Sequence, residues 1–256
     1  MREDVVREFT HQAPAFDQAP VYRSAETLDR LVAALPLNPG DAWLDVACGT
    51  GIVSLALAPH VARVVGLDLT AAMLTQGRSA AREAGIANVD FVEGDGQALP
   101  FPDATFAGAI TRFALHHLPL PERVVAEMAR VVRPGGCVAL ADHLTSGQAV
   151  AALWHQSIER LRDPSPWACL PPDAFFSLGA SVGLHLARRE EIPFSLDFAD
   201  WLQRGSGGAT HRQEIAALLA RPPAGAAEAM RVAGGRLHYR LGIGLWQRPQ
   251  ANSVKE

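Results

Sequence analysis

The chain has 256 residues, of which 48% are hydrophobic and 20% are charged, a composition typical of a folded globular protein rather than a disordered chain. The net charge is −4, from 23 basic and 27 acidic residues, so a nucleic-acid-binding protein is not expected. We also expect neither a membrane span nor a signal peptide, because the apolar stretches are short and residues 1–8 are rich in charge.

The three cysteines, Cys48, Cys137 and Cys169, are far apart in the sequence. Their spacing favours neither a disulfide framework nor a metal cluster, so no metal site is expected. Cys48 and Cys137 are interpreted as small core residues. Length and composition predict one domain over residues 1–256 that acts as a cytoplasmic enzyme, and they leave its oligomeric state open.

The first half of the chain alternates short apolar runs with amphipathic stretches, which is typical of βα units around a mostly parallel sheet. Residues 1–23 are expected to be an irregular cover, with Phe9, Phe16 and Tyr22 either anchoring it or forming a lid. Helices are then expected over 24–35, 52–60, 71–84 and 121–132, a turn over 133–136, and strands over 42–46, 63–67, 89–93, 106–110 and 137–141.

The pattern changes after residue 143. A helix is expected over 149–162, a proline-rich loop over 163–172, a further helix up to residue 181 and a strand over 184–192. Residues 197–232 are expected to form two or three small helices, and residues 236–248 a final extended run.

A glycine-rich turn follows the strand at 42–46, where the segment 44–51 reads LDVACGTG. Gly49 and Gly51 allow a ligand to approach the backbone closely, and the N-terminus of the next helix offers N–H groups to an anion. Because α/β proteins bind ligands at the carboxyl ends of parallel strands, the turn is interpreted as a cofactor site.

Two cofactors compete for this turn. A dinucleotide requires the pattern G-x-G-x-x-G/A, but Ser54 occupies its last position. Asp45 would repel a pyrophosphate, whereas it would pair with the ammonium group of S-adenosylmethionine. Asp68 ends the second strand and suits the ribose hydroxyls of either cofactor. The main alternative at this point is therefore an NAD(P)-dependent oxidoreductase.

The sequence resembles class I S-adenosylmethionine-dependent methyltransferases, in particular the branch of the ubiquinone and menaquinone C-methyltransferases. The matching motifs occur in the family's order: LDVACGTG at 44–51, GLD at 66–68, GDGQALPFPDATF at 94–106, RFALHHL at 112–118 and RVVRPGG at 130–136. Ala47 departs from the glycine of many members, and a negative φ there would make the departure cheap. The resemblance implies a doubly wound, Rossmann-like α/β fold with a mostly parallel seven-stranded sheet.

The fold is expected to divide the chain into the N-terminal cover, a cofactor-binding half (24–143) and a substrate-covering half (144–256). The resemblance implies that S-adenosylmethionine is bound by Asp45, Ala47, Gly49, Gly51, Asp68, Leu69, Met73, Asp95, Gly96, Thr111 and Arg112. Within this set, Asp45 and a backbone carbonyl near Thr111 would hold the amine. Asp95 and the Gly96 backbone would hold the adenine, on which Leu69 and Met73 pack.

Polar side chains after the fourth and fifth strands are candidates for chemistry. His116 and His117 follow the fourth strand and His143 follows the fifth, and histidine takes up a proton near neutral pH. The alternative is that these rings pack against the sheet and bond to backbone. Arg112 is expected beside the methionyl end of the cofactor, with a surface ion pair as the alternative.

Two further groups belong to the second half. His155 and Glu159 are one helical turn apart, and we expect them on a solvated face, with a mutual pair or a position facing the pocket as the alternative. Five aromatic side chains are expected either to line a substrate pocket or to fill the core, namely Trp154, Trp167, Phe175, Phe176 and Trp201.

The expected reaction is transfer of a sulfonium methyl group to an O, N or C nucleophile of a small molecule, with a base needed only where the nucleophile must lose a proton. The small net charge argues against tRNA, rRNA or protein as substrate. A protein that binds S-adenosylmethionine without methylating is a further alternative. The substrate, the acceptor atom and the identity of any base stay open.

Overall fold

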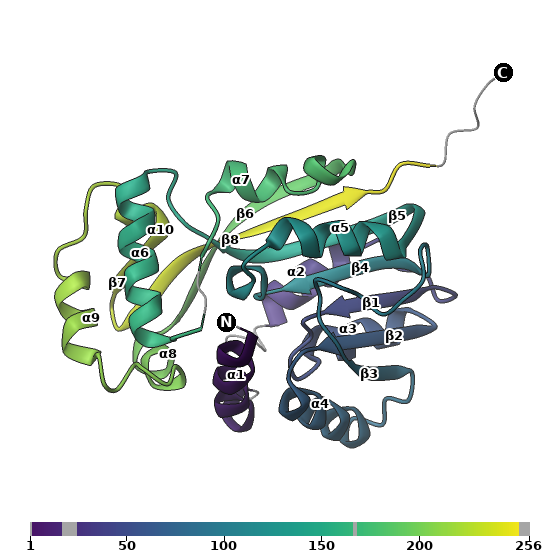
Figure 1. The fold of residues 1–256 in the computed structure, drawn as a ribbon, viewed down its shortest axis with the longest axis horizontal. Helices are drawn as coiled ribbons and strands as arrows, with labels where there is room; N and C mark the ends of the chain where they lie inside the picture. Colours follow the sequence, from purple (N-terminus) through teal and green to yellow (C-terminus); the bar gives the residue numbers. More distant parts are fainter. Residues whose placement is uncertain (1, 17–24, 166–167, 251–256) are drawn as a thin grey trace.

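The structure is a computed structural model that describes residues 2–16, 25–165 and 168–250. At its centre is one sheet with the strand order β3-β2-β1-β4-β5-β8-β6, and β7 pairs with the beginning of β8 (Figure 1). The strands are β1 (Ala42–Val46), β2 (Arg63–Asp68), β3 (Val89–Glu93), β4 (Phe106–Arg112), β5 (Val132–Leu144), β6 (His185–Asp197), β7 (Met230–Ala233) and β8 (Arg236–Gln247).

The sheet is mostly parallel, as the sequence predicts. All pairs among β1 to β5 are parallel, whereas β8 runs antiparallel to both β5 and β6. The seven expected strands form the continuous path, and β7 is added at its side. The strand order reverses between β1 and β4, and such a switch point opens a crevice at the carboxyl ends of the strands.

Helices cover both faces of the sheet. They are α1 (Arg2–Phe16), α2 (Ala25–Ala34), α3 (Ile52–Leu57), α4 (Ala71–Glu83), α5 (Pro121–Val131), α6 (Ala149–Arg162), α7 (Pro172–Ser177), α8 (Phe198–Arg204), α9 (Arg212–Leu219) and α10 (Ala226–Ala229). Alternation along β1 sends Trp43 into the core shared with Leu57 of α3 and Leu44 into the core shared with Met128 of α5. Burial on both faces explains why the central strands are nearly continuous apolar runs.

The N-terminal segment corrects one prediction, because residues 2–16 form a helix where an irregular cover was expected. Val5, Phe9 and Ala13 are spaced by four and therefore share one face, and acidic side chains in the first turn favour the helix dipole. The helix contacts α4 and α8, so it lies between α4 and the lobe formed by α6, α8, α9 and α10 (Figure 1). Tyr22 and the side chain of Phe16 fall outside the described residues.

Two other expectations also need correction. The segment 197–232 contains β7 as well as helices, because Gly234 (φ 56°) and Gly235 (φ 73°) form a tight turn that pairs β7 with β8. The turn expected at 133–136 lies inside β5, where Gly135 has φ 78° and the pairing with β4 shifts register.

The two long strands β6 and β8 join the sheet to the C-terminal lobe. They pair along their whole length, whereas β5 pairs only with residues 240–247 of β8. The beginning of β8, including Tyr239, therefore extends past β5 and lies beneath the helices of the lobe (Figure 1). In the described part of the chain, no helix is both long enough and apolar enough to cross a membrane.

Candidate active site

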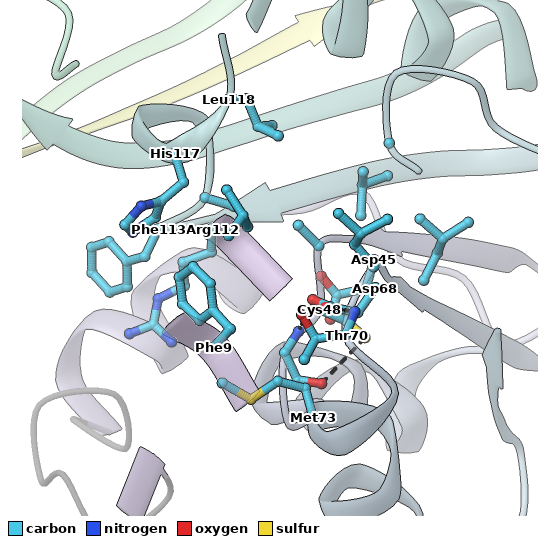
Figure 2. Close-up of a pocket in the computed structure, with 18 of the residues that line it drawn as sticks. Phe9, Asp45, Cys48, Asp68, Thr70, Met73, Arg112, Phe113, His117 and Leu118 are labelled. Atoms are coloured by element: carbon cyan, nitrogen blue, oxygen red, sulfur yellow. Dashed lines mark hydrogen bonds between the residues drawn. The ribbon is translucent and has the colours of Figure 1, made fainter. Parts of the chain in front are cut away.

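A cavity of about 950 Å³ lies at the carboxyl ends of β1, β2 and β4, and α1 closes one side of it (Figure 2). We call it the cofactor cavity. Its described lining contains most of the predicted cofactor residues, namely Asp45, Ala47, Gly49, Asp68, Leu69, Met73, Asp95, Gly96 and Arg112. Gly51 and Thr111 stand outside this described lining, and Val5, Phe9, Phe113 and Leu118 are added to it.

Asp45 is almost fully buried near the end of β1, where its Oδ2 accepts a hydrogen bond of 2.6 Å from the hydroxyl of Ser54. Burial raises the pKa of Asp45 to about 7, and the charge of Asp68 adds to the rise. A ligand cation would stabilise the ionised carboxylate, as the sequence argument requires. Ser54, which breaks the dinucleotide pattern, thus has a structural role beside Asp45.

Asp68 ties the glycine turn to the end of β2. Its Oδ2 accepts the backbone N–H of Gly49 at 2.8 Å, and its Oδ1 accepts the N–H of Thr70, also at 2.8 Å (Figure 2). Burial raises the pKa of this carboxyl group as well. Asp68 therefore holds in place both the glycine turn and Thr70, the residue before α4, and it also lines the cofactor cavity.

The turn itself overturns one expectation. Ala47 has φ 55°, a left-handed conformation that costs a residue with a Cβ about 1 kcal/mol, so the departure from glycine is not cheap. Gly51 also has a positive φ, of 80°, and a Cβ there would lie 2.6 Å from the ring of Phe91. Gly51 is thus needed for packing against β3 rather than for the cavity wall.

The far wall is formed after β3 and β4. Asp95 accepts the backbone N–H of Gln97 at 2.9 Å, which is a turn-forming bond, and its Oδ2 lies 3.7 Å from Nη1 of Arg2 on α1. Arg112 is buried rather than in a surface ion pair, and its guanidinium carbon lies 4.6 Å from the ring centroid of Phe113. Thr111 is buried within β4.

The chemistry of this cavity fits S-adenosylmethionine. Asp45 offers a carboxylate to an ammonium group, Asp68 and Asp95 offer acceptors to ribose hydroxyls and an adenine amino group, and Leu69 and Met73 supply apolar surface for a ring. Three acidic side chains in one cavity would oppose a pyrophosphate.

A second cavity of about 470 Å³ adjoins the first and shares Phe9, Phe113 and His117 with it. We call it the acceptor cavity. Its other described lining residues come from α1, α6, α8, the loop after β4, and strands β5, β6 and β8; they are Gln12, His116, His143, Glu159, Arg162, Asp163, Phe194, Leu196, Trp201 and Tyr239.

His116 and Asp142 form a buried hydrogen-bonded pair. Nδ1 of His116 lies 2.5 Å from Oδ1 of Asp142, and the backbone N–H of His116 donates to Oδ2 at 3.1 Å. Burial opposes ionisation of Asp142, but attraction to His116 outweighs it and lowers the pKa of the carboxyl group. Asp142 is not among the residues predicted from the sequence, although it directly precedes His143 near the end of β5.

The other two histidines are uncharged. Burial lowers the pKa of His117 to about 3, and Nδ1 of this ring lies 3.0 Å from the hydroxyl of Ser165. Burial also lowers the pKa of His143 to about 3, and its ring lies 4.7 Å from Phe113 and 4.8 Å from Tyr239, measured between centroids.

Donor atoms of His116, Asp142 and His143 lie within 4.8 Å of one another, a grouping that the sequence spacing did not suggest and that is able to hold a metal ion. Asp142 Oδ1 faces the His116 ring and also accepts the backbone N–H of His143 at 2.7 Å. The carboxylate is thus already engaged in hydrogen bonds, which favours a histidine–aspartate pair over a metal centre.

The face of α6 expected in solvent is buried. His155 and Glu159 are at most 1% exposed, because this face of α6 packs towards β8, from which Tyr239 donates a hydrogen bond to Glu159. Nε of Arg162 donates to Glu159 at 3.3 Å, and Nδ1 of His155 lies 3.1 Å from the hydroxyl of Thr145.

The remaining predicted residues divide between core and cavity. Trp154, Phe175 and Phe176 belong to the hydrophobic cores, Trp201 lines the acceptor cavity, and Trp167 lies outside the described residues. Cys137 is a core residue as expected, whereas Cys48 lines the cofactor cavity. The described cysteines are free thiols, and burial raises the pKa of each.

Comparison with known proteins shows the family to which the chain belongs. Residues 44–136 match the methyltransferase domain family. The methyltransferase YcgJ of Bacillus subtilis is 28% identical over 207 residues (81% of this chain and 82% of that protein), and its crystal structure has the same fold, with a TM-score of 0.80 over 88% of this chain and 99% of that one at 24% identity.

Two further relatives are enzymes with stated activities. Phosphatidylethanolamine N-methyltransferase of Cereibacter sphaeroides is 35% identical over 144 residues, which are 56% of this chain and 70% of that protein. Demethylmenaquinone methyltransferase of Listeria welshimeri is 39% identical over 109 residues, which are 41% of this chain and 46% of that protein. The resemblance seen in the motifs is confirmed, and the chain belongs to the class I S-adenosylmethionine-dependent methyltransferases.

Proposed function

We propose that this methyltransferase acts on a small molecule held in the acceptor cavity, and that His116 takes a proton from the acceptor atom. One observation carries this proposal: the acceptor cavity adjoins the cofactor cavity through Phe9, Phe113 and His117 and is lined by His116, which pairs with the buried Asp142. Relatives named for a phospholipid and for a menaquinone precursor leave the acceptor open.

We assign the cofactor to the nine predicted residues that line the cofactor cavity. Asp45 faces the ammonium group, Asp68 the ribose and Asp95 the adenine. When bound there, S-adenosylmethionine supplies an electrophilic methyl group. We also propose that the backbone near Thr111, within β4, binds the amine of the cofactor. Gly51 acts indirectly, because it lets the glycine turn pack against Phe91.

His116 is the best placed general base. Asp142 accepts a hydrogen bond from Nδ1 of His116, which fixes the orientation and the tautomer of the ring. His117 and His143, with pKa values of about 3, are weak bases, so we assign them to positioning and to the exclusion of water. Phe9 closes both cavities from α1 and serves the same purpose.

We propose that the whole chain acts as one unit, because β6 and β8 of the substrate-covering half complete the sheet that carries the cofactor cavity. Both cavities are covered by α1, which suits a compact acceptor rather than a segment of RNA or protein. The free thiols suit a reducing compartment, and we propose that the enzyme acts in the cytoplasm.

The test is methyl transfer from S-adenosylmethionine labelled in its methyl group. Small amines, phenols, carboxylic acids and activated carbon acids are supplied as acceptors, beside total tRNA and a protein mixture. We expect label in small molecules alone, and loss of that label in His116→Gln while S-adenosylhomocysteine still binds. Label in tRNA or protein, or undiminished transfer by His116→Gln, would contradict the proposal.

A further inference from the structure

We propose that the methyl acceptor is a small primary or secondary amine that enters the acceptor cavity as an ammonium ion. This inference rests on the proposed function and adds the chemical class of its substrate. It follows from the excess of carboxylates over cations in a cavity whose other lining residues are mostly aromatic rings.

Three buried carboxyl groups lie in or beside the acceptor cavity. Glu159 and Asp163 line the acceptor cavity and are fully buried, and Asp142 lies 2% exposed behind His116. The pKa of each of these three carboxyl groups is lowered in spite of burial, so each is ionised at neutral pH. Two negative charges thus line the acceptor cavity, and a third lies directly behind His116.

The positive charge among the described lining residues is smaller. Arg162 reaches both neighbouring carboxylates, with Nε 3.3 Å from Glu159 and Nη2 3.3 Å from Asp163. Arg112 lines the cofactor cavity instead, where it faces the charge of Asp45. The net charge around the acceptor cavity is therefore negative even if His116 carries a proton. Buried charge in excess of its counter-charge is destabilising, and a ligand cation relieves that cost.

Aromatic rings provide the rest of the wall. The rings of Phe113, His143 and Tyr239 lie in succession, with centroids 4.7 and 4.8 Å apart, and Phe194 lies 5.3 Å from Phe113. Aromatic faces attract cations, most strongly where water is excluded. An anionic acceptor would meet repulsion here, and a neutral one would leave the excess charge uncompensated.

The ammonium form also explains the need for a base, because its nitrogen has no lone pair. His116 accepts one proton from the ammonium nitrogen. The freed nitrogen lone pair then forms the bond to the methyl carbon while the carbon–sulfur bond breaks, and its electron pair stays on sulfur. The products are an N-methylammonium ion and S-adenosylhomocysteine, and His116 passes its proton to water.

The experiment measures binding to the full chain saturated with S-adenosylhomocysteine. Benzylamine, 2-phenylethylamine and cyclohexylamine are each titrated beside the alcohol and the carboxylic acid of the same skeleton. We expect at least one amine to bind, roughly 10-fold or more tighter than its matched alcohol, and the acids to bind most weakly. Equal or tighter binding of the alcohols or acids, or no binding of any amine, overturns the inference.

Charge-neutral variants sharpen the result. Glu159→Gln and Asp163→Asn should each reduce the preference for amine over alcohol roughly 10-fold and leave S-adenosylhomocysteine affinity unchanged. Asp173→Asn, at a side chain 98% exposed on α7, is the matched control and should change neither quantity. Retained affinity for S-adenosylhomocysteine shows that a variant is folded. If a variant loses that affinity, binding of the amines, alcohols and acids to the wild-type protein still tests the inference.

The two proposals fail differently. If labelled methyl groups reach phenols or carboxylic acids but not amines, the chain is a small-molecule methyltransferase and the amine inference is wrong. If label reaches only tRNA or protein, the proposed function is wrong and the amine inference falls with it.

Discussion

The two cavities meet at three side chains but are built on different principles. The cofactor cavity is formed by the turns that follow parallel strands, and burial raises the pKa values of its acids Asp45 and Asp68. The acceptor cavity combines α1, α6, β6 and β8, and its acids Glu159 and Asp163 have lowered pKa values beside Arg162. The first cavity thus holds carboxyl groups that a cationic ligand would ionise, whereas the second holds two carboxylates that share the single charge of Arg162.

The largest expected effect is on kcat, in a variant that loses the proposed base but keeps the cofactor cavity intact. His116→Gln should lower kcat by roughly 10² to 10⁴, because the base is lost, and should leave the affinity for S-adenosylhomocysteine unchanged. Steady-state kinetics and calorimetry give the two quantities. Asp142→Asn should act in the same direction.

The same assay distinguishes the hydrogen-bonded pair from a metal centre at His116, Asp142 and His143. Treatment with EDTA should leave the wild-type rate unchanged. Loss of activity that is restored by a divalent ion would assign these residues to a metal instead.

The next effect belongs to the cofactor cavity alone. Asp68→Ala removes a ribose acceptor and the partner of the Gly49 and Thr70 N–H groups, so affinity for S-adenosylhomocysteine should fall roughly 100-fold. Asp90→Ala, at an exposed carboxylate of β3 paired with Arg63, is the control and should bind normally. Normal binding by Asp68→Ala would remove this residue from the site.

The raised pKa of Asp45 predicts a pH dependence. Cofactor affinity should fall about tenfold for each pH unit below about 7, because the proton on Asp45 must be released before the ligand ammonium can pair with it. Because the folded pKa of Asp45 lies above its ordinary value of 3.8, the ligand-free protein should lose stability as the pH rises from about 3.8 to about 7, and the cofactor should restore it. Calorimetry and thermal melts across this range check both, and a flat affinity profile would contradict the assignment.

A smaller effect should appear in both cavities at once. Phe9→Ala removes an apolar wall that the cavities share, and we expect the KM for cofactor and for acceptor each to rise about fivefold, equivalent to ~1 kcal/mol. Thr10→Ala, on an exposed position of the same helix, should change neither KM. A change confined to one substrate would show that α1 serves only one cavity.

The smallest effect tests the strained turn. Ala47→Gly relieves a positive φ but increases the freedom of the unfolded chain, so the gain in stability should be less than about 1 kcal/mol. Ala84→Gly, where φ is −82°, gives no such relief and should lose stability. Thermal melts compare the two, and a clear loss in Ala47→Gly would contradict the strain.

The sequence predicts the cofactor cavity better than it predicts the acceptor cavity. In the cofactor half, Asp45 and Asp68 could be placed because strand ends in a parallel sheet share one edge and the motifs are local. In the acceptor cavity, Gln12, Asp163 and Tyr239 are brought together by long-range packing that no local spacing encodes. The helix at 2–16 had a readable period of four in Val5, Phe9 and Ala13, and the tight turn at Gly234 and Gly235 signalled β7.

The central claim is that the cofactor cavity binds S-adenosylmethionine and no dinucleotide. Calorimetric titration of the purified chain with S-adenosylhomocysteine, beside NADH and NADPH, tests it most directly. The arrangement of Asp45, Asp68 and the glycine turn predicts micromolar binding of S-adenosylhomocysteine alone. Absence of that binding, or tighter binding of either nicotinamide cofactor, would contradict it.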